Sequence, residues 1–184
     1  VLMPGVDNSK YAMPTGVVNL NVTKDAHLTL VFAAELAAWR NAIGYYYYDT
    51  QNPPRTQAEF DALPKYVAFP NCSSFTTNFD DPDDLGSGGG DWTAPLFFGE
   101  QLRLTCFRGG KATDIFPAGT TVGWFMLPDA YEISAYDYTG KLDITGSKHP
   151  ARYSNNEFNA GNGRYMVSLY DKVSGKTVLG FEDG

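Results

Sequence analysis

The sequence is poor in charge, in histidine and in cysteine. Of the 184 residues only 19% are charged, and there are two histidines and two cysteines. Lys and Arg number 14 against 21 acidic residues, which gives a formal net charge of -7. A surface that binds nucleic-acid phosphates needs clustered Lys and Arg. The sequence has no such cluster, so we expect no nucleic-acid partner.

Long apolar runs are also lacking. No run approaches the roughly 20 apolar residues that a helix needs to cross a bilayer. The first residues show neither the basic segment nor the apolar segment of a signal peptide. We therefore expect no transmembrane segment in this chain, and expect that any signal peptide was removed or left out.

Turn-forming and aromatic residues are abundant instead, with Gly 19, Pro 11, Tyr 12 and Phe 12. This composition argues against disorder, coiled coils and helical bundles, and it favours many short strands. We predict an all-β fold, mainly an antiparallel, jelly-roll-like β-sandwich, with one short helix. Residues 1–16 read as an irregular lead-in, and 17–184 as a single domain excised from a longer chain.

The strands are predicted from alternating apolar residues and from the turn signals between them. Between the first two strands and the third, residues 33–43 have mixed preferences, and we interpret them as a short turn before a strand. Residues 70–95 read as a loop. The predicted strands are 17–22, 27–32, 42–49, 65–69, 101–107, 121–127, 133–138, 164–170 and 176–181.

The one helix is predicted near 57–63. Thr56 and Glu59 have the spacing of a capping box, in which the hydroxyl caps the N3 amide and the carboxylate returns to the cap amide. Pro64 should end the helix near Leu63. Trp124, in the strand 121–127, is expected to be largely buried.

No catalytic residue is assigned from the sequence. His27 and His149 are the only histidines, and no G-x-S-x-G nucleophile elbow accompanies them. We interpret both as surface or rim residues. A pair of carboxylates for glycoside hydrolysis stays open as an alternative, because the separation of such a pair is spatial rather than sequential.

The two cysteines, Cys72 and Cys106, have no spacing for zinc binding or redox work. In an extracytoplasmic protein they could form a disulfide, and the alternative is two separate buried thiols.

Two acidic segments are candidate metal ligands. Calcium takes six to eight hard oxygens, usually from closely spaced carboxylates. The segment at 80–91 lacks the alternating ligands and the distal Glu of an EF-hand loop, so a solvated acidic loop is the competing interpretation. No cofactor is certain. The candidates are Asp80, Asp81, Asp83, Asp84 and Asp91 in one segment, with Glu182 and Asp183 in the other.

Aromatic residues offer a candidate sugar-binding platform, because flat rings pack on the apolar faces of pyranoses. Strand alternation within Tyr45–Tyr48 would turn two rings inward and two outward. Trp92, in a glycine-rich stretch, is the better candidate, and Tyr46 and Tyr48 are weaker ones.

Several segments, taken in order, resemble the LruC-type domain of bacterial surface and secreted proteins, a family of unknown molecular function. The resemblance covers roughly 27–184, and "PAGT-x-x-GW" and "GFED" are its more specific parts. The segments are Trp39–Tyr48, Asn52–Pro54, Val67–Ser73, Phe98–Leu104, Phe116–Leu127, Tyr153–Asn155 and Leu179–Asp183.

The resemblance implies an exported, surface-associated β-rich domain. In the family, "GFED" usually continues into an Asp-x-Asp-x-Asn-Asp stretch with the look of a cation-binding loop. This sequence stops at Gly184. We therefore expect weak or no calcium binding by this chain, and stronger binding by a form that extends past Gly184.

These observations together favour a non-catalytic, extracytoplasmic module of a bacterial cell-surface protein, with a role in adhesion or envelope structure. Its partners would be other surface-protein domains or glycans. The alternative is a carbohydrate-binding module, and a secreted hydrolase is less favoured.

Overall fold

The structure is a computed structural model, and it describes residues 18–31, 42–69, 101–127, 150–171 and 176–181. The strands are β1 (Leu20–Val22), β2 (Thr29–Val31), β3 (Ala42–Asp49), β4 (Lys65–Phe69), β5 (Gln101–Arg103), β6 (Cys106–Arg108), β7 (Lys111–Thr113), β8 (Thr120–Leu127), β9 (Arg152–Tyr153), β10 (Met166–Asp171) and β11 (Lys176–Phe181). The helices are α1 (Gln57–Asp61) and the 3-10 helices η4 (Asn156–Phe158) and η5 (Ala160–Asn162).

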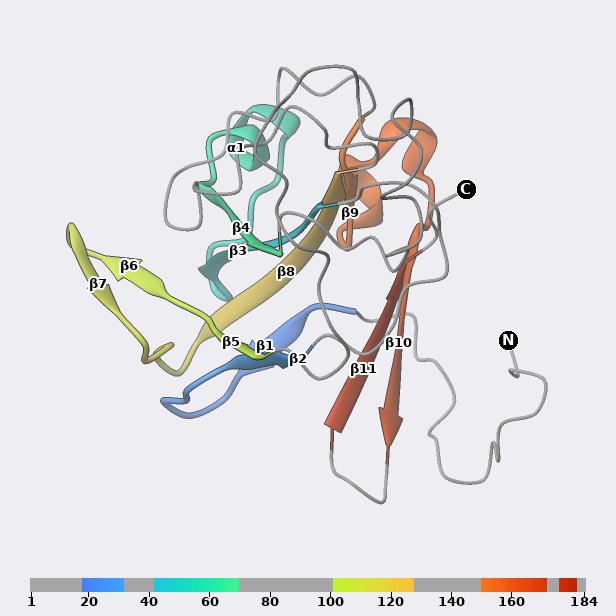
Figure 1. Ribbon diagram of the computed structural model, residues 1–184. Coiled ribbons are helices and arrows are strands. Elements are labelled where there is room, and N and C mark those ends of the chain that lie inside the picture. Colours follow the sequence, from blue (N-terminus) through green and yellow to red (C-terminus); the bar gives the residue numbers. More distant parts are fainter. Residues whose placement is uncertain (1–17, 32–41, 70–100, 128–149, 172–175, 182–184) are drawn as a thin grey trace, which may run out of the picture.

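A five-stranded antiparallel sheet organises the described part of the chain (Figure 1). Its order is β1-β8-β3-β4, and the short β9 also pairs with β8. The two long strands, β3 and β8, pair along their whole length, from Ala42 opposite Leu127 to Asp49 opposite Thr120. Aromatic and β-branched residues dominate both strands, as suits a pleated surface covered on both faces.

Three two-stranded antiparallel pairs accompany this sheet: β10–β11, β2–β5 and β6–β7. The β6–β7 hairpin turns through Gly109 and Gly110, whose φ angles are 56° and 76°. Two consecutive positive φ angles define the type I′ turn that matches the twist of a hairpin, and glycine adopts them at little cost.

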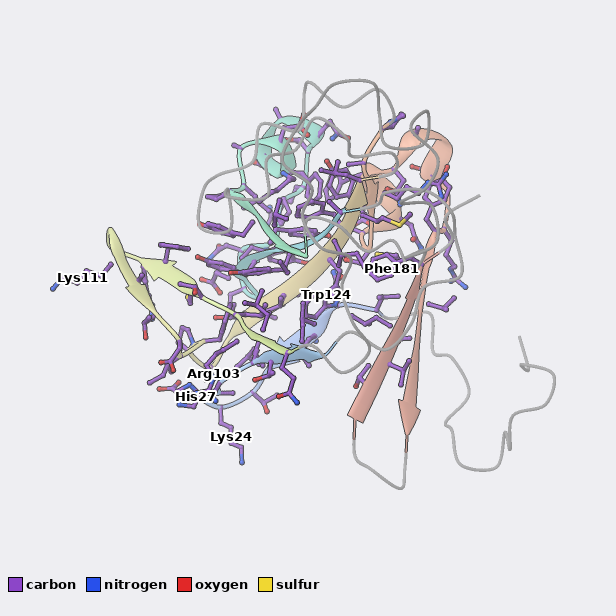
Figure 2. The ribbon with its side chains drawn as sticks, viewed as in Figure 1. Lys24, His27, Arg103, Lys111, Trp124 and Phe181 are labelled. Carbon is purple, nitrogen blue, oxygen red and sulfur yellow. The ribbon has the colours of Figure 1, made fainter. Side chains whose placement is uncertain are left out.

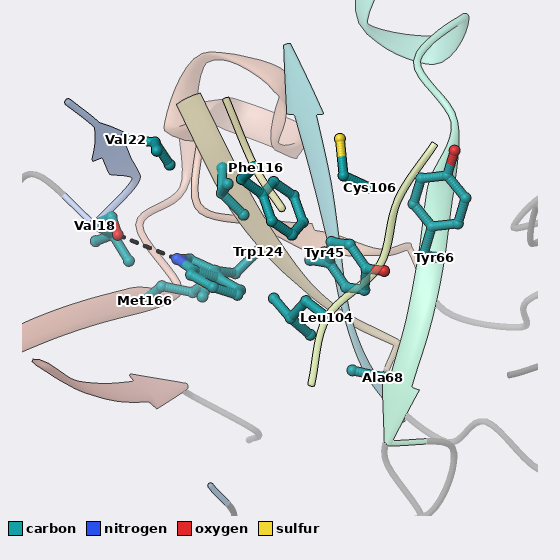
Figure 3. Packing of buried hydrophobic residues seen from close by; sticks show 11 residues of the cluster. Val18, Val22, Tyr45, Tyr66, Ala68, Leu104, Cys106, Phe116, Trp124 and Met166 are labelled. Atoms are coloured by element: carbon teal, nitrogen blue, oxygen red, sulfur yellow. Dashed lines mark hydrogen bonds between the residues drawn. The ribbon is translucent and has the colours of Figure 1, made fainter. Parts of the chain in front are cut away.

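One face of the central sheet is covered by the smaller strand pairs and forms the first core (Figure 3). Trp124 lies at its centre with 4% of its surface exposed, and its indole Nε1 donates to the Val18 carbonyl at 3.3 Å. Met166 of β10 and Leu104 after β5 are each 1% exposed in the same cluster. Strands packed on strands give this side a sandwich-like arrangement.

The opposite face of the sheet is covered by α1 and by the segment around η4, which form the second core. Phe60 of α1 is fully buried, and its ring stacks on Phe158 with centroids 4.2 Å apart. Tyr153 meets the Phe60 ring edge-on at 4.7 Å. Buried residues of the central sheet complete this core: Ala42, Tyr46, Phe125 and Leu127.

The predicted helix is confirmed, together with its capping box. The Glu59 amide donates to the Thr56 hydroxyl at 3.2 Å, and the Thr56 amide donates to the Glu59 carboxylate at 3.2 Å. The helix ends at Asp61, with Ala62 as its C-cap. Lys65 lies buried beyond that end, where its ammonium donates to the Phe60 carbonyl at 2.8 Å.

The predicted fold class is confirmed, because the described strands pair antiparallel and one short helix joins them. The predicted strand 101–107 is interrupted and becomes β5 and β6, and β7 and β9 were not predicted. The burial of Trp124 is confirmed. Residues 1–16, most of 33–43, the strand 133–138 and the loop 70–95 lie outside the described residues, and the single-domain assignment stays a prediction.

Candidate functional site

Most of the residues predicted as ligands lie outside the described part of the chain. This holds for His149 as well. The structure does describe Tyr46, Tyr48, His27 and Cys106. Outside it lie the predicted disulfide partner Cys72 and the predicted ligands Trp92, Asp80, Asp81, Asp83, Asp84, Asp91, Glu182 and Asp183.

The tyrosine run alternates as predicted, but the prediction that two rings face outward is wrong. Tyr45 and Tyr47 join the first core, whereas Tyr46 and Tyr48 join the second. Both faces of the sheet are covered, so Tyr46 is 0% exposed and cannot offer its ring to a ligand. Tyr48, nearer the end of β3, is half-buried and is the member of the pair that a ligand could reach.

Tyr46 and Tyr48 belong to a polar cluster that we call the asparagine–tyrosine network. The Tyr46 hydroxyl donates to Asn155 Oδ1 at 2.8 Å and lies 3.1 Å from the Ser154 hydroxyl. Burial raises the pKa of Tyr46, so this hydroxyl stays protonated and able to donate. The network consists of Asn19, Tyr46, Tyr48, Ser154, Asn155 and Glu157.

Asn19 connects the two ends of the network. Its amide nitrogen donates to Asn155 Oδ1 at 2.7 Å and contacts the Tyr48 hydroxyl at 3.4 Å. Its side-chain oxygen Oδ1 accepts a hydrogen bond from the Ser154 hydroxyl, which itself accepts from the Trp124 amide at 2.9 Å. The network is therefore anchored directly on the backbone of the central strand β8.

The outer end of the network reaches solvent. The Asn155 side-chain amide donates to one carboxylate oxygen of Glu157 at 2.8 Å, and Glu157 is exposed. On the face of the sheet that carries Tyr48, the Thr121 hydroxyl donates to Asn21 Oδ1 at 2.9 Å. Asn21 and Tyr48 both lie opposite Thr121, one on each side of β8. Three polar side chains thus form one row across β1, β8 and β3.

Sequence reasoning had not selected Asn19, Ser154, Asn155 or Glu157. Ser154 and Asn155 did carry a signal, because Tyr153-Ser154-Asn155 is one of the segments on which the family resemblance rests. The hydrogen-bond partners of Asn155 could not be foreseen, because Asn19 and Asn155 are 136 positions apart in the sequence.

A second polar group lies at an exposed position around His27 (Figure 2). His27 Nδ1 lies 2.9 Å from the Asp114 carbonyl oxygen and 3.3 Å from its carboxylate. Arg103 contacts the same carboxylate at 3.3 Å. The Asp114 side chain is thus shared by an imidazole and a guanidinium at the surface, which agrees with the rim position predicted for His27.

Cys106 lies in the first core as a buried, free thiol with 2% of its surface exposed. Burial raises the pKa of this thiol, so it is held in the unreactive protonated form. This is the state that the alternative of two separate buried thiols expects at Cys106, and the predicted disulfide partner, Cys72, lies outside the described residues.

Within the described ranges, no three side chains of the His, Cys, Asp or Glu type come together as a metal site. None of the helices described is both long and apolar enough to span a membrane. The calcium expectation rests on residues outside these ranges and remains untested.

Comparisons with protein-family models, with curated proteins and with solved structures gave no significant match.

Proposed function

We propose that this chain is a non-catalytic, extracytoplasmic module of a bacterial cell-surface protein, with a role in adhesion or envelope structure. The proposal starts from the resemblance to the LruC-type domain. The observation that supports it best is where the resembling segments lie in the fold. Their described residues build turns and cores, as expected for segments that specify a scaffold.

The "PAGT-x-x-GW" segment is the clearest case. Gly119 has a φ of 84° and its amide donates to the Val22 carbonyl at 2.8 Å. Its own carbonyl accepts from the Thr50 amide at 2.8 Å. The turn therefore joins β1, β3 and β8, and five residues later Trp124 enters the first core. Gly119 and Trp124 of this pattern thus each have a structural reason to be there.

The other segments have similar positions. Phe181 of the "GFED" segment packs against the first core, which contains Trp124 (Figure 2). Tyr153 lies in the second core, and Ser154 accepts a hydrogen bond from the Trp124 amide. A family defined by such positions shares a fold, and function would then differ with the surface that each member presents.

The cellular part of the proposal can be tested in the source organism. We expect an antibody against this chain to detect it in the envelope or the medium. We also expect added protease to degrade it on intact cells. Retention in the cytoplasm, protected from protease until lysis, would contradict the proposal.

The catalytic part needs a separate assay. The purified protein should not turn over ester, peptide or glycoside substrates above the background of a heat-unfolded sample. Turnover that disappears when a single carboxylate is replaced, for example in Asp114→Asn, would make the chain a hydrolase and overturn this part.

A further inference from the structure

The edge of the asparagine–tyrosine network combines three features that a binding site requires. It holds polar groups in fixed positions, it includes an accessible aromatic ring, and part of it lies at the surface. We call this edge, together with the pair Asn21 and Thr121 that lies next to Tyr48 on the sheet, the polar strip. It consists of Asn19, Asn21, Tyr48, Thr121, Asn155 and Glu157, of which Asn21 and Glu157 are exposed and Tyr48 is half-buried.

Buried hydrogen-bond partners hold side chains of the polar strip in fixed positions. Tyr46, fully buried, donates to Asn155, and Ser154, 8% exposed, donates to Asn19. The Tyr46 ring meets Phe60 edge-on at 5.1 Å, so the second core holds the base of the network in place. Side chains held in this way lose little further entropy when a ligand binds, which favours affinity.

The aromatic member is positioned by the same strand. The rings of Tyr46 and Tyr48 lie 19° from parallel with centroids 6.5 Å apart. Tyr48 packs against the edge of the second core and accepts a long contact from Asn19 at its hydroxyl. Its partly exposed ring can therefore serve as an apolar platform next to hydrogen-bonding groups.

The chemistry of the strip limits the class of ligand. Its groups are three amides, one hydroxyl, one phenol and one carboxylate, and none of its members is a cation. Among the described residues, Glu157 uses Oε1 to accept from Asn155, and its Oε2 could accept from a ligand hydroxyl. An anionic ligand would be repelled by this carboxylate and by the net charge of -7.

We propose that the polar strip binds a neutral carbohydrate. The Tyr48 ring would lie against the apolar face of a pyranose, while Asn21 and Glu157 would hydrogen-bond its hydroxyls. This inference rests on the proposed function, because a non-catalytic surface module acts by binding. It assigns that binding to residues of the central sheet rather than to Trp92.

The test begins with an array of neutral and acidic oligosaccharides, followed by calorimetry with the best-binding neutral oligosaccharide. Tyr48→Ala and Glu157→Gln should each weaken binding about tenfold or more, because one removes the platform and the other a charge-assisted acceptor. Glu157→Gln retains an oxygen for Asn155 and should leave the fold intact. Near-ultraviolet circular dichroism checks this for both variants.

Tyr165→Ala provides a matched control, because Tyr165 is also half-buried but lies under Arg152, outside the strip. Its affinity should equal that of the parent protein. The proposal is overturned if no neutral oligosaccharide binds, if acidic ones bind instead, or if both strip variants bind like the parent. Cell fractionation is unaffected by these outcomes, so the proposed surface location can stand when the sugar site fails.

Discussion

At the scale of single residues, two tyrosine hydroxyls make hydrogen bonds to backbone groups that a neighbouring strand would otherwise make. The Tyr45 hydroxyl donates to the Thr105 carbonyl at 2.8 Å and accepts from the Thr105 amide at 3.1 Å. The Tyr47 hydroxyl makes the same pair of contacts with Phe107, at 3.1 Å and 2.6 Å. Backbone groups removed from water need partners, and these hydroxyls supply them where β5 gives way to β6.

Tyr45→Phe should therefore lower the free energy of unfolding by about 1–3 kcal/mol, because it leaves the Thr105 amide and carbonyl without their partner. Urea unfolding measures this change. Tyr48→Phe is the control, since among the described residues its hydroxyl makes just a 3.4 Å contact with Asn19, and the loss there should be smaller. Equal stability of Tyr45→Phe and the parent would contradict this role of the hydroxyl.

At the scale of elements, α1 is a helix of five residues that depends on its ends. A helix this short is unstable by itself, because nucleation costs more than its few hydrogen bonds return. The capping box satisfies its first amides, Lys65 satisfies carbonyls at its other end, and Phe60 fixes it to the second core. Local sequence signals and distant packing act together here.

Thr56→Ala should cost about 1 kcal/mol of stability through loss of the N-cap hydroxyl. Thr56→Ser, which retains the hydroxyl, should unfold at nearly the same urea concentration as the parent. The effect assigned to the cap would be refuted if the serine and alanine variants were equally destabilised.

The extent to which sequence predicts each element follows from the range of its contacts. The capping box and the glycine turn at 109–110 involve neighbours in sequence, and both could be read directly. The alternation within Tyr45–Tyr48 was also readable. Whether a face is covered depends on distant residues such as Phe60 and Thr105, so the exposure of Tyr46 was predicted wrongly. The network around Asn155 joins segments that no local pattern connects.

At the scale of the whole described structure, one sheet separates two cores. Strand β8 is buried along its entire length, with Trp124 in the first core and Phe125 in the second. Neither core can lose its packing without disturbing this shared strand, so we expect them to unfold together.

Phe60→Ala, in the second core, should lower the free energy of unfolding by about 3–5 kcal/mol. Tryptophan fluorescence and far-ultraviolet circular dichroism should still give one coincident transition, and separate transitions would show independent cores.

The buried tyrosines also make the whole structure sensitive to alkali. Burial raises the pKa of Tyr45 from 10.0 to about 12, and it raises those of Tyr46, Tyr47 and Tyr153 as well. Below pH 10 these phenols are protonated in both the native and the unfolded state, so they make no contribution to the pH dependence of stability. Above it the unfolded chain loses protons that the native state retains, so stability should fall as pH rises from about 10 to 12.

Phenolate absorbance should then show exposed tyrosines titrating first and the buried set ionising together with unfolding. A single smooth titration of all 12 tyrosines near pH 10, with the circular dichroism unchanged, would contradict the core positions described for these four.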